Sequence, residues 1–300
     1  MFDIIIIGSG PAGMTSAIYG ARMNLKVLVI EKGAPGGAMV NTYKIENYPG
    51  FASIDGATLS MNMFEQMTSL GVEFLGDEVE KITKDGDTFT VKTTYSLYQG
   101  KTVILATGTN NRKIGAINEE KFLGRGISFC AICDGSLYKD KDVMVVGGGN
   151  SAIEEALYLA NIAKKVYLVH RRDSFRAALK SVDELKKKEN VEFILNSVLE
   201  EFSGDKKLEQ VLIKNLKTEK EEWIKVDGVF EYVGQIPNNE AFIDLGITND
   251  NGYVLVDGNF ETKIEGLFAC GDIIEKGVRQ IATAVNDGAI SALSASRYIK

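Results

Sequence analysis

The chain of 300 residues is 45% hydrophobic and 25% charged, the composition of a globular protein of about two domains. Its formal net charge of −7 argues against nucleic acid as a general partner, and no stretch approaches the roughly 20 apolar residues of a membrane helix. The first apolar run ends at Gly8 and the chain has only three cysteines, so we expect a cytoplasmic protein without a secretory signal rather than a secreted disulfide scaffold.

A strand, a glycine-rich turn and a helix open the chain. Residues 2–7 predict a strand, the helical pattern continues to about Met23, and a second strand over residues 26–30 ends at Glu31. The turn consists of Gly8, Ser9, Gly10, Pro11, Ala12 and Gly13. Its first glycine permits the tight turn, its second admits a pyrophosphate to the backbone, and its third packs the helix on the strand. The pattern predicts a dinucleotide site at the helix N-terminus, and a glycine-rich turn without a ligand is the alternative.

Glu31 indicates which nucleotide the first turn binds. A carboxylate at the end of the second strand accepts bonds from ribose hydroxyls and repels a 2′-phosphate. That chemistry suits FAD or NAD(H). We therefore interpret the first site as the FAD site.

Cys130 and Cys133 are separated by two small or apolar residues, and Asp134 follows them directly. The thiolate is the reactive form of cysteine, and this spacing near a helix start lowers the pKa of the first thiol. The pair can cycle between dithiol and disulfide by exchange, and Asp134 is placed to move protons. A buried inert pair or half of a metal site is the alternative, although the third cysteine, Cys270, is distant and is expected to be a small buried residue. We predict no metal site.

The strand–turn–helix pattern repeats after the two cysteines. Residues 142–146 predict a strand, a helix continues to about Ala163, and a second strand over residues 165–169 ends at His170. The turn residues are Gly147, Gly148, Gly149, Asn150, Ser151 and Ala152, with Ala152 in the third small position. His170 follows Gly147 by 23 positions, as Glu31 follows Gly8, so the two units have the same size.

Basic residues distinguish the second site from the first. Arg171 and Arg172 follow His170, and Arg176 lies four residues further on. Guanidinium groups bind phosphate bidentately, so this cluster predicts NADPH, with a solvated basic turn as the alternative. His170 is the only histidine, and its position favours nucleotide contact over catalysis. A Ser-His-Asp triad would have to use this residue, and no nucleophile-elbow motif appears.

Further motifs extend along most of the chain. They are Gly36–Gly37, Glu46–Asn47–Tyr48–Pro49–Gly50, Ala106–Thr107–Gly108, Gly234 with Pro237–Asn238, and Gly271–Asp272 with Arg279–Gln280. Together with the two turns, the cysteine pair and the basic cluster, they resemble the motifs of the low-molecular-weight thioredoxin reductases, which are NADPH-dependent, FAD-containing pyridine nucleotide-disulfide oxidoreductases. The chain departs from that pattern at Ala38, where the family commonly has glutamine, and at Glu231–Tyr232, where it often has apolar residues.

The resemblance implies a role for each motif. Cys133 would face the flavin, Cys130 would attack thioredoxin, and Asp134 would act as acid and base. Gly271–Asp272 would hold the ribityl and pyrophosphate portion of FAD. The other residues assigned to the flavin site are Lys32, Gly36, Gly37, Ala38, Asn47, Ala106, Thr107, Gly108, Arg279, Gln280 and Ile281. The family also implies a homodimer.

The predicted fold class is α/β, with two Rossmann-like dinucleotide-binding domains. Residues 1–111 and 239–300 would form the FAD domain, and residues 112–238 would form an inserted NADPH domain that carries the redox dithiol. Electrons would pass from NADPH through FAD and the dithiol to thioredoxin. Two alternatives stay open: the same path to another disulfide acceptor, such as a peroxiredoxin-linked or glutaredoxin-like protein, and a non-catalytic flavin-binding redox sensor.

Overall fold

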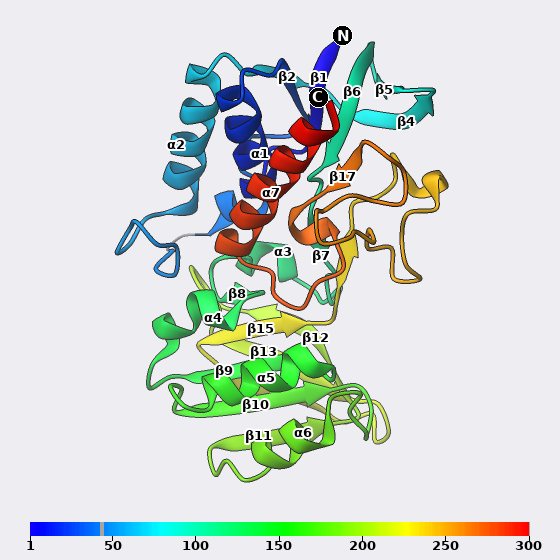
Figure 1. Cartoon of the computed structure of the whole chain (residues 1–300). Helices are drawn as coiled ribbons and strands as arrows, with labels where there is room; N and C mark the ends of the chain where they lie inside the picture. The colour runs from blue at the N-terminus through cyan, green and yellow to red at the C-terminus, as the bar shows by residue number, and fades with distance from the viewer. Residues whose placement is uncertain (43–44, 300) are drawn as a thin grey trace. The chain divides into compact units, whose positions relative to one another are not determined.

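The computed structural model describes residues 1–42 and 45–299, which form two compact units (Figure 1). Unit 1 comprises Met1–Asn110 and Ile236–Lys300, and unit 2 is the continuous segment Asn111–Gln235. The chain passes between them at strands β7 (Thr109–Asn111) and β16 (Gln235–Pro237), which pair as a two-stranded sheet. Unit 2 combines helices with a parallel sheet and unit 1 combines them with a sheet that is parallel except at β4 and β5, so the predicted α/β class is confirmed. Which cofactor each unit binds stays a prediction.

A seven-stranded sheet forms the centre of unit 1. Its strands are β1 (Phe2–Ile7), β2 (Val27–Glu31), β3 (Glu73–Gly76), β4 (Val79–Asp85), β5 (Thr88–Thr93), β6 (Leu97–Leu105) and β17 (Leu267–Ala269). The order is β3-β2-β1-β6-β5-β4, and β17 pairs with the second half of β6. Because β1 lies between β2 and β6, its carboxyl end is where the strand order reverses, the place where nucleotides bind in such sheets.

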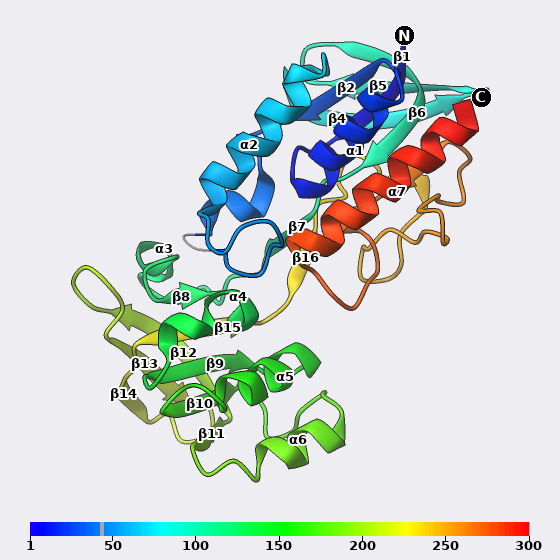
Figure 2. The same ribbon diagram turned by 60° about the vertical axis from the view of Figure 1, so that its left-hand side comes forward.

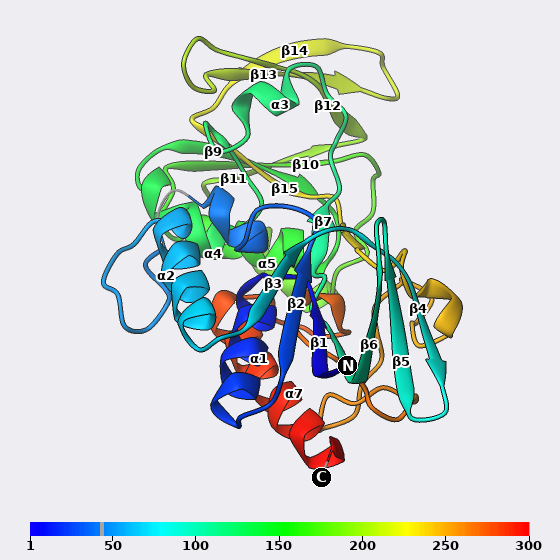
Figure 3. The ribbon, with the colours of Figure 1, turned by 90° about the horizontal axis from the view of Figure 1, so that it is seen from above.

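Three helices cover one face of this sheet: α1 (Pro11–Arg22), α2 (Gly56–Ser69) and α7 (Ile281–Ile299) (Figures 2 and 3). Ile4 and Ile6 pack with these helices, whereas Ile5 and Ile7 pack in a second core on the opposite face. Both faces of β1 are therefore buried, which explains its unbroken apolar sequence.

Unit 2 has a parallel sheet with different layers on its two faces. The sheet order is β11 (Val191–Leu195), β10 (Lys165–His170), β9 (Asp142–Gly147), β15 (Gly228–Tyr232) and β8 (Ile127–Ser128). Helices α4 (Ala131–Asp134), α5 (Asn150–Leu159) and α6 (Leu179–Leu185) contribute to the core on one face. The antiparallel strands β12 (Ser197–Ser203), β13 (Gln210–Asn215) and β14 (Glu221–Lys225), with the short helix α3 (Glu119–Phe122), close the core on the other.

The strands of both predicted repeats agree with the structure to within one residue, but the second helix was predicted too long. Helix α5 ends at Leu159 rather than near Ala163. The backbone N–H groups of Ile162 and Ala163 both donate to the Leu159 carbonyl, at 3.0 and 2.8 Å, so the chain turns instead of continuing the helix. The Ile162 carbonyl then accepts a hydrogen bond from the Asp140 backbone N–H, which connects this turn to the segment before β9.

Candidate active site

The first glycine-rich turn joins β1 to α1 with almost no space between them. Gly8 has a φ of 101°, and a Cβ there would overlap the Ala106 carbonyl oxygen at the end of β6. A Cβ at Gly13 would overlap the Gly8 carbonyl oxygen. A Cβ at Gly10 would meet nothing within 4 Å, so the backbone is open only where a pyrophosphate has to approach. No side chain caps the helix start at Gly10, which leaves first-turn N–H groups for phosphate oxygens.

Glu31 is fixed beside this turn. Its Oε2 accepts hydrogen bonds from the backbone N–H of Ser9 at 2.8 Å and from the Ser9 hydroxyl at 3.0 Å, and its Oε1 accepts from Gly33 N–H at 2.9 Å. Lys32 points to Glu78 on the surface, in an exposed ion pair at 3.5 Å. The structure thus holds the Glu31 carboxylate against the backbone of the first glycine-rich turn.

Gly36 and Gly37 lie against the same turn. Gly36 N–H donates to the Ser9 carbonyl at 2.9 Å, and a Cβ at Gly37 would lie 3.2 Å from the Gly10 Cα atom. Ala38 follows as an exposed residue of a short 3-10 helix. The two glycines therefore allow this segment to pass close to the first glycine-rich turn.

Residues of the predicted flavin pocket come together from distant parts of the sequence. Asn47 Nδ2 donates to Gln280 Oε1 at 3.0 Å. Thr107 Oγ1 and Asp272 Oδ1 are buried without a hydrogen-bond partner among the described residues, and burial raises the Asp272 pKa. Such orphaned polar atoms fit a site that is completed by the hydroxyl and phosphate groups of a bound flavin nucleotide. Arg279 lies 4.5 Å over the Tyr253 ring and donates to nearby carbonyls, including Lys276 O at 3.0 Å.

Lys276 and Asp287 are supporting residues that the sequence analysis missed. Their side chains are 13% and 7% exposed and form an ion pair of 2.7 Å, and Asp287 also accepts from Gly271 N–H at 3.3 Å. Lys276 lies 3.6 Å from Asp272 Oδ1. Asp287 could have been recognised from the sequence, because it is a charged residue among the small residues of α7. That face of α7 packs on α1.

The second turn, between β9 and α5, has the same construction as the first. Gly147 has a φ of 153°, and a Cβ there would lie 2.6 Å from the Tyr232 carbonyl oxygen and 2.8 Å from the Ala152 Cβ. A Cβ at Gly149 would meet nothing within 4 Å, as at Gly10 in the first turn. Asn150 begins α5 with its Oδ1 accepting from Ala178 N–H at 2.9 Å, and Ser151 is exposed beside it.

His170 is 7% exposed and lies beneath this turn. Its ring stacks on Phe175 with centroids 5.3 Å apart, and Nε2 lies 3.1 Å from the Ser174 carbonyl oxygen. Burial lowers the His170 pKa, and the charges of the three neighbouring arginines lower it further. We conclude that the neutral ring packs directly against the Gly148 backbone, since a Cβ added at Gly148 would overlap the ring.

Arg171, Arg172 and Arg176 are exposed around His170. Within the described part of the chain none of the three forms an ion pair, although carboxylates are abundant in unit 2. The Arg176 backbone N–H donates to the Gly148 carbonyl at 2.8 Å, which holds the arginine segment beside the turn. The arrangement offers unpaired guanidinium groups to a phosphate near the second turn.

We expect Gly149→Ala to weaken NADPH binding about tenfold without lowering stability, because its Cβ enters open space that a pyrophosphate would occupy. Gly148→Ala is the matched variant, since its Cβ would overlap the His170 ring and should cost about 1–3 kcal/mol of unfolding free energy. Equilibrium NADPH titration and urea unfolding of both variants check the two effects separately. Unchanged NADPH affinity in Gly149→Ala would contradict the assignment of this turn.

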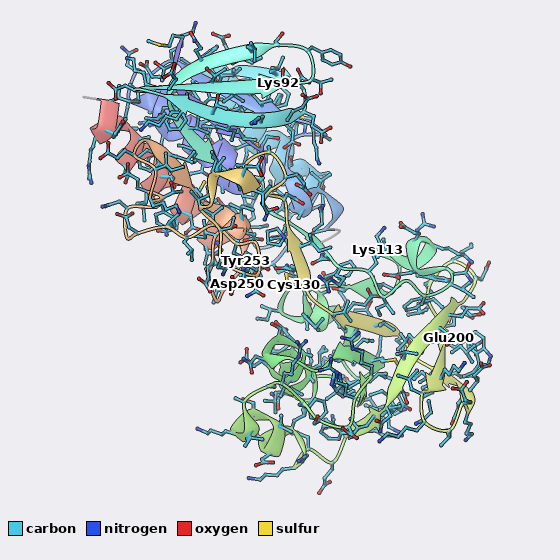
Figure 4. The ribbon with its side chains drawn as sticks, turned by 90° about the vertical axis from the view of Figure 1, so that its right-hand side faces the viewer. Lys92, Lys113, Cys130, Glu200, Asp250 and Tyr253 are labelled. Atoms are coloured by element: carbon cyan, nitrogen blue, oxygen red, sulfur yellow. A yellow bond between two sulfur atoms is a disulfide. The ribbon has the colours of Figure 1, made fainter. Side chains whose placement is uncertain are left out.

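Cys130 and Cys133 form a disulfide at the start of α4, with Cα atoms 5.3 Å apart (Figure 4). Both residues are half-buried, and Cys133 N–H donates to Cys130 Sγ at 3.2 Å. Cys270, by contrast, is fully buried, and burial raises its thiol pKa to about 12. The prediction that Cys270 is a small buried residue is confirmed, and the half-buried pair is the one that a reaction partner can reach.

Asp134 closes the short helix that carries the cysteines. Its Oδ2 accepts from the Ser128 hydroxyl at 2.6 Å, while Ser128 Oγ also accepts from Cys130 N–H at 3.1 Å. Burial raises the Asp134 pKa, and the bond from Ser128 opposes that rise. A carboxyl group with a raised pKa, directly after Cys133 and four residues after Cys130, is suited to exchange protons with their sulfurs.

Metal-binding clusters and membrane-spanning helices are both absent from the described residues. No cluster of three or more histidine, cysteine, aspartate or glutamate side chains has the geometry to hold a metal ion there. None of the helices in residues 1–42 and 45–299 has the length and apolarity needed to cross a membrane.

Comparison with known proteins gives full-length matches. A family model described as pyridine nucleotide-disulphide oxidoreductase matches residues 2–288. The thioredoxin reductase of Listeria monocytogenes is 44% identical over 100% of this chain and 94% of its own, and that of Bacillus subtilis is 44% identical over 100% and 95%. The crystal structure of thioredoxin reductase from Streptococcus pyogenes superposes with a TM-score of 0.95 at 47% identity, covering 99% of this chain and 98% of that one.

Proposed function

The chain belongs to the pyridine nucleotide-disulphide oxidoreductase family, and we propose on that premise that it is an NADPH-dependent thioredoxin–disulfide reductase whose electrons pass through FAD and the Cys130–Cys133 pair. The observation that carries the proposal is the half-buried disulfide Cys130–Cys133, which lies in the same unit as a glycine-rich turn flanked by three exposed arginines. Bound FAD supplies hydride acceptance and onward two-electron transfer.

The residues of unit 1 bind and orient the flavin nucleotide in this proposal. The Gly8–Gly13 turn and the start of α1 hold the pyrophosphate, and Glu31 accepts from the ribose. Asp272 Oδ1 and Thr107 Oγ1, which have no hydrogen-bond partner among the described residues, form hydrogen bonds with the cofactor. Asn47 and Gln280 line the pocket. Unit 2 holds NADPH between the Gly147–Ala152 turn and the arginines.

The dithiol step is ordinary thiol–disulfide exchange. The Cys130 thiolate attacks one sulfur of the thioredoxin disulfide, and the other thioredoxin sulfur leaves and takes a proton. Cys133 then attacks Cys130, which re-forms the enzyme disulfide and releases thioredoxin as a dithiol. Asp134 exchanges the protons that this cycle moves, because its raised pKa keeps it able to hold one near the sulfurs.

The direct test is NADPH oxidation by the purified FAD-loaded enzyme with oxidised thioredoxin. We expect steady turnover that depends on the thioredoxin disulfide. A panel with glutaredoxin-like and peroxiredoxin-linked acceptors tests the same electron path with another substrate. A flavin that NADPH reduces but that no acceptor reoxidises would contradict the reductase assignment and favour a redox sensor.

We also propose that the protein acts as a homodimer in the cytoplasm. The homodimer follows from the family, whose motifs the chain shares along its length, and it is tested by sedimentation of the FAD-loaded enzyme. The cytoplasmic assignment is supported by the cysteine pattern, because a redox pair and a buried free thiol suit a reducing compartment.

Replacing Arg171 and Arg172 together by alanine should weaken NADPH binding far more than NADH binding. Each charge-assisted bond to the 2′-phosphate is worth roughly 1.5–3 kcal/mol, so the preference for NADPH should fall by at least about tenfold. The measurement is kcat/KM for both cofactors. Arg125→Ala, another exposed arginine of unit 2, is the control and should leave the preference unchanged. Equal losses for the two cofactors would mean that Arg171 and Arg172 only support the fold.

A further inference from the structure

Two residues outside the cysteine motif contact the backbone between the cysteines. Tyr232, the last residue of β15, accepts a hydrogen bond at its hydroxyl from Ala131 N–H at 2.6 Å. Glu155 lies on α5, and burial raises its pKa. The nearby Ile132 N–H and Tyr232 hydroxyl oppose that rise. Helices α4 and α5 and strand β15 are neighbours within unit 2 (Figure 1).

These contacts decide which donors face the Cys130 sulfur. Three backbone N–H groups follow Cys130, and they would all stabilise a thiolate there. Cys133 N–H donates to Cys130 Sγ. The Tyr232 hydroxyl accepts the N–H of Ala131, and the Glu155 carboxyl lies near enough to the N–H of Ile132 for that donor to lower its pKa. The Ala131 donor is therefore directed away from the sulfur, and the carboxyl of Glu155 competes with the sulfur for the Ile132 donor.

Glu155 also places a carboxyl group in the core beside the helix that carries the cysteine pair, and burial raises its pKa. Its Oε2 is buried and has no hydrogen-bond partner among the described residues. Burial raises the Tyr232 pKa, and the charges of Glu155 and Asp134 raise it further, so the tyrosine stays neutral and able to donate to the carboxylate. The acidic groups that face this network are Glu154, Glu155 and Asp134, and none of its members is a cation.

We propose that Tyr232 and Glu155 are positioning residues that withhold backbone donors from the Cys130 sulfur and thereby make the Cys130–Cys133 couple more reducing. A stabilised thiolate favours the reduced form of such a pair and makes it an oxidant, so a less stabilised thiolate has the opposite effect. A reductase that passes electrons onward to another disulfide needs such a more reducing couple. The inference rests on the proposed function only in that Cys130–Cys133 is the redox pair.

The test equilibrates the FAD-loaded enzyme with mixtures of reduced and oxidised dithiothreitol. In this exchange the two enzyme thiols lose two electrons and two protons to the oxidised reagent, which becomes a dithiol. Alkylation and mass spectrometry then give the fraction of Cys130–Cys133 that is oxidised. Glu155→Gln and Tyr232→Phe should each shift the equilibrium constant about three- to tenfold toward the dithiol, where tenfold is about 30 mV for a two-electron couple.

Matched variants separate this effect from a general loss of structure. Glu184→Gln, an exposed residue of α6, and Tyr167→Phe, on β10 away from the cysteines, should leave the equilibrium unchanged. In Glu155→Gln the difference from the parent should shrink at acidic pH, where the parent carboxylate also takes a proton, a change that packing alone does not produce. If Tyr232→Phe fails to fold, the Glu155→Gln measurement decides the question alone.

A shift below twofold in both variants, or a shift toward the disulfide, would overturn the inference. A shift in Tyr232→Phe alone would remove Glu155 from it. Because the readout needs no thioredoxin, failure of thioredoxin turnover would count against the proposed function and leave this result standing. A pair that dithiothreitol cannot reduce would instead remove the redox role of Cys130–Cys133 itself.

Discussion

Cys133→Ser is expected to leave FAD bound and reducible by NADPH while abolishing thioredoxin reduction. Flavin reduction needs no thiol, whereas the onward step needs both sulfurs, because the disulfide re-forms only when Cys133 attacks Cys130. The flavin absorption spectrum, recorded on addition of NADPH and then of oxidised thioredoxin, measures the two half-reactions in one sample. The flavin should bleach and stay bleached.

The control for that variant is Cys270→Ala. Cys270 is fully buried, and its thiol pKa of about 12 keeps it protonated, so its loss should leave turnover close to that of the parent. Appreciable thioredoxin reduction by Cys133→Ser, or its loss in Cys270→Ala alone, would show that the electrons take another path.

Glu231→Gln should stabilise unit 2 at alkaline pH by several kcal/mol. Glu231 is 3% exposed on β15, and both of its oxygens lack a hydrogen-bond partner among the described residues. Burial, followed by the charge of Glu119, raises its pKa from 4.5 to about 9. The Glu119 carboxylate accepts hydrogen bonds from three backbone N–H groups, including Gly115 at 2.7 Å. The folded protein therefore keeps Glu231 protonated at neutral pH.

The pH dependence follows from that difference. The stability contributed by protonated Glu231 is fully present below the unfolded pKa of 4.5 and is lost as the pH rises toward the folded pKa of about 9. Between these values the unfolding free energy should fall by up to about 1.4 kcal/mol per pH unit, and the neutral amide of Glu231→Gln should flatten the slope. The measurement is urea unfolding at several pH values, followed by the fluorescence of Trp223. This residue is the only tryptophan and lies on β14, so its signal reports on unit 2.

Glu222→Gln, an exposed residue of the same strand β14, serves as the control and should keep the parent slope. Identical slopes in the parent and in Glu231→Gln would show that Glu231 titrates normally and that the fold tolerates its charge.

The sequence predicted the two nucleotide turns because their signals are local. A buried strand such as β1 is a continuous apolar run, and the turn after it needs glycine wherever a Cβ would strike neighbouring backbone, as at Gly8 and Gly13. The cysteine pair was predictable for the same reason, since its spacing lies within one helical turn. These features specify chemistry through residues that are adjacent in the chain.

The supporting contacts were not predictable, because they join residues far apart in sequence. Tyr232 reaches Ala131 across 101 positions, and Asp287 pairs with Lys276 only after α7 packs beside the Gly271 turn. Glu231 departs from the family pattern, but the neighbouring charge that acts on it, Glu119, lies on a helix of four residues that no periodicity could reveal. Such pairs depend on the assembled fold.

The packing of α7 on α1 determines when the flavin site can exist during synthesis. Ser16 donates to the Gly288 carbonyl at 3.0 Å, and a Cβ at Gly288 would overlap the Ala12 carbonyl oxygen, so the helix that carries the first glycine-rich turn is held by a segment near residue 290. On the ribosome all of Asn111–Gln235 emerges before that segment. The inserted unit therefore can fold while the outer one is still unfinished, and the first glycine-rich turn gains its α7 contacts only when nearly the whole chain has been synthesised.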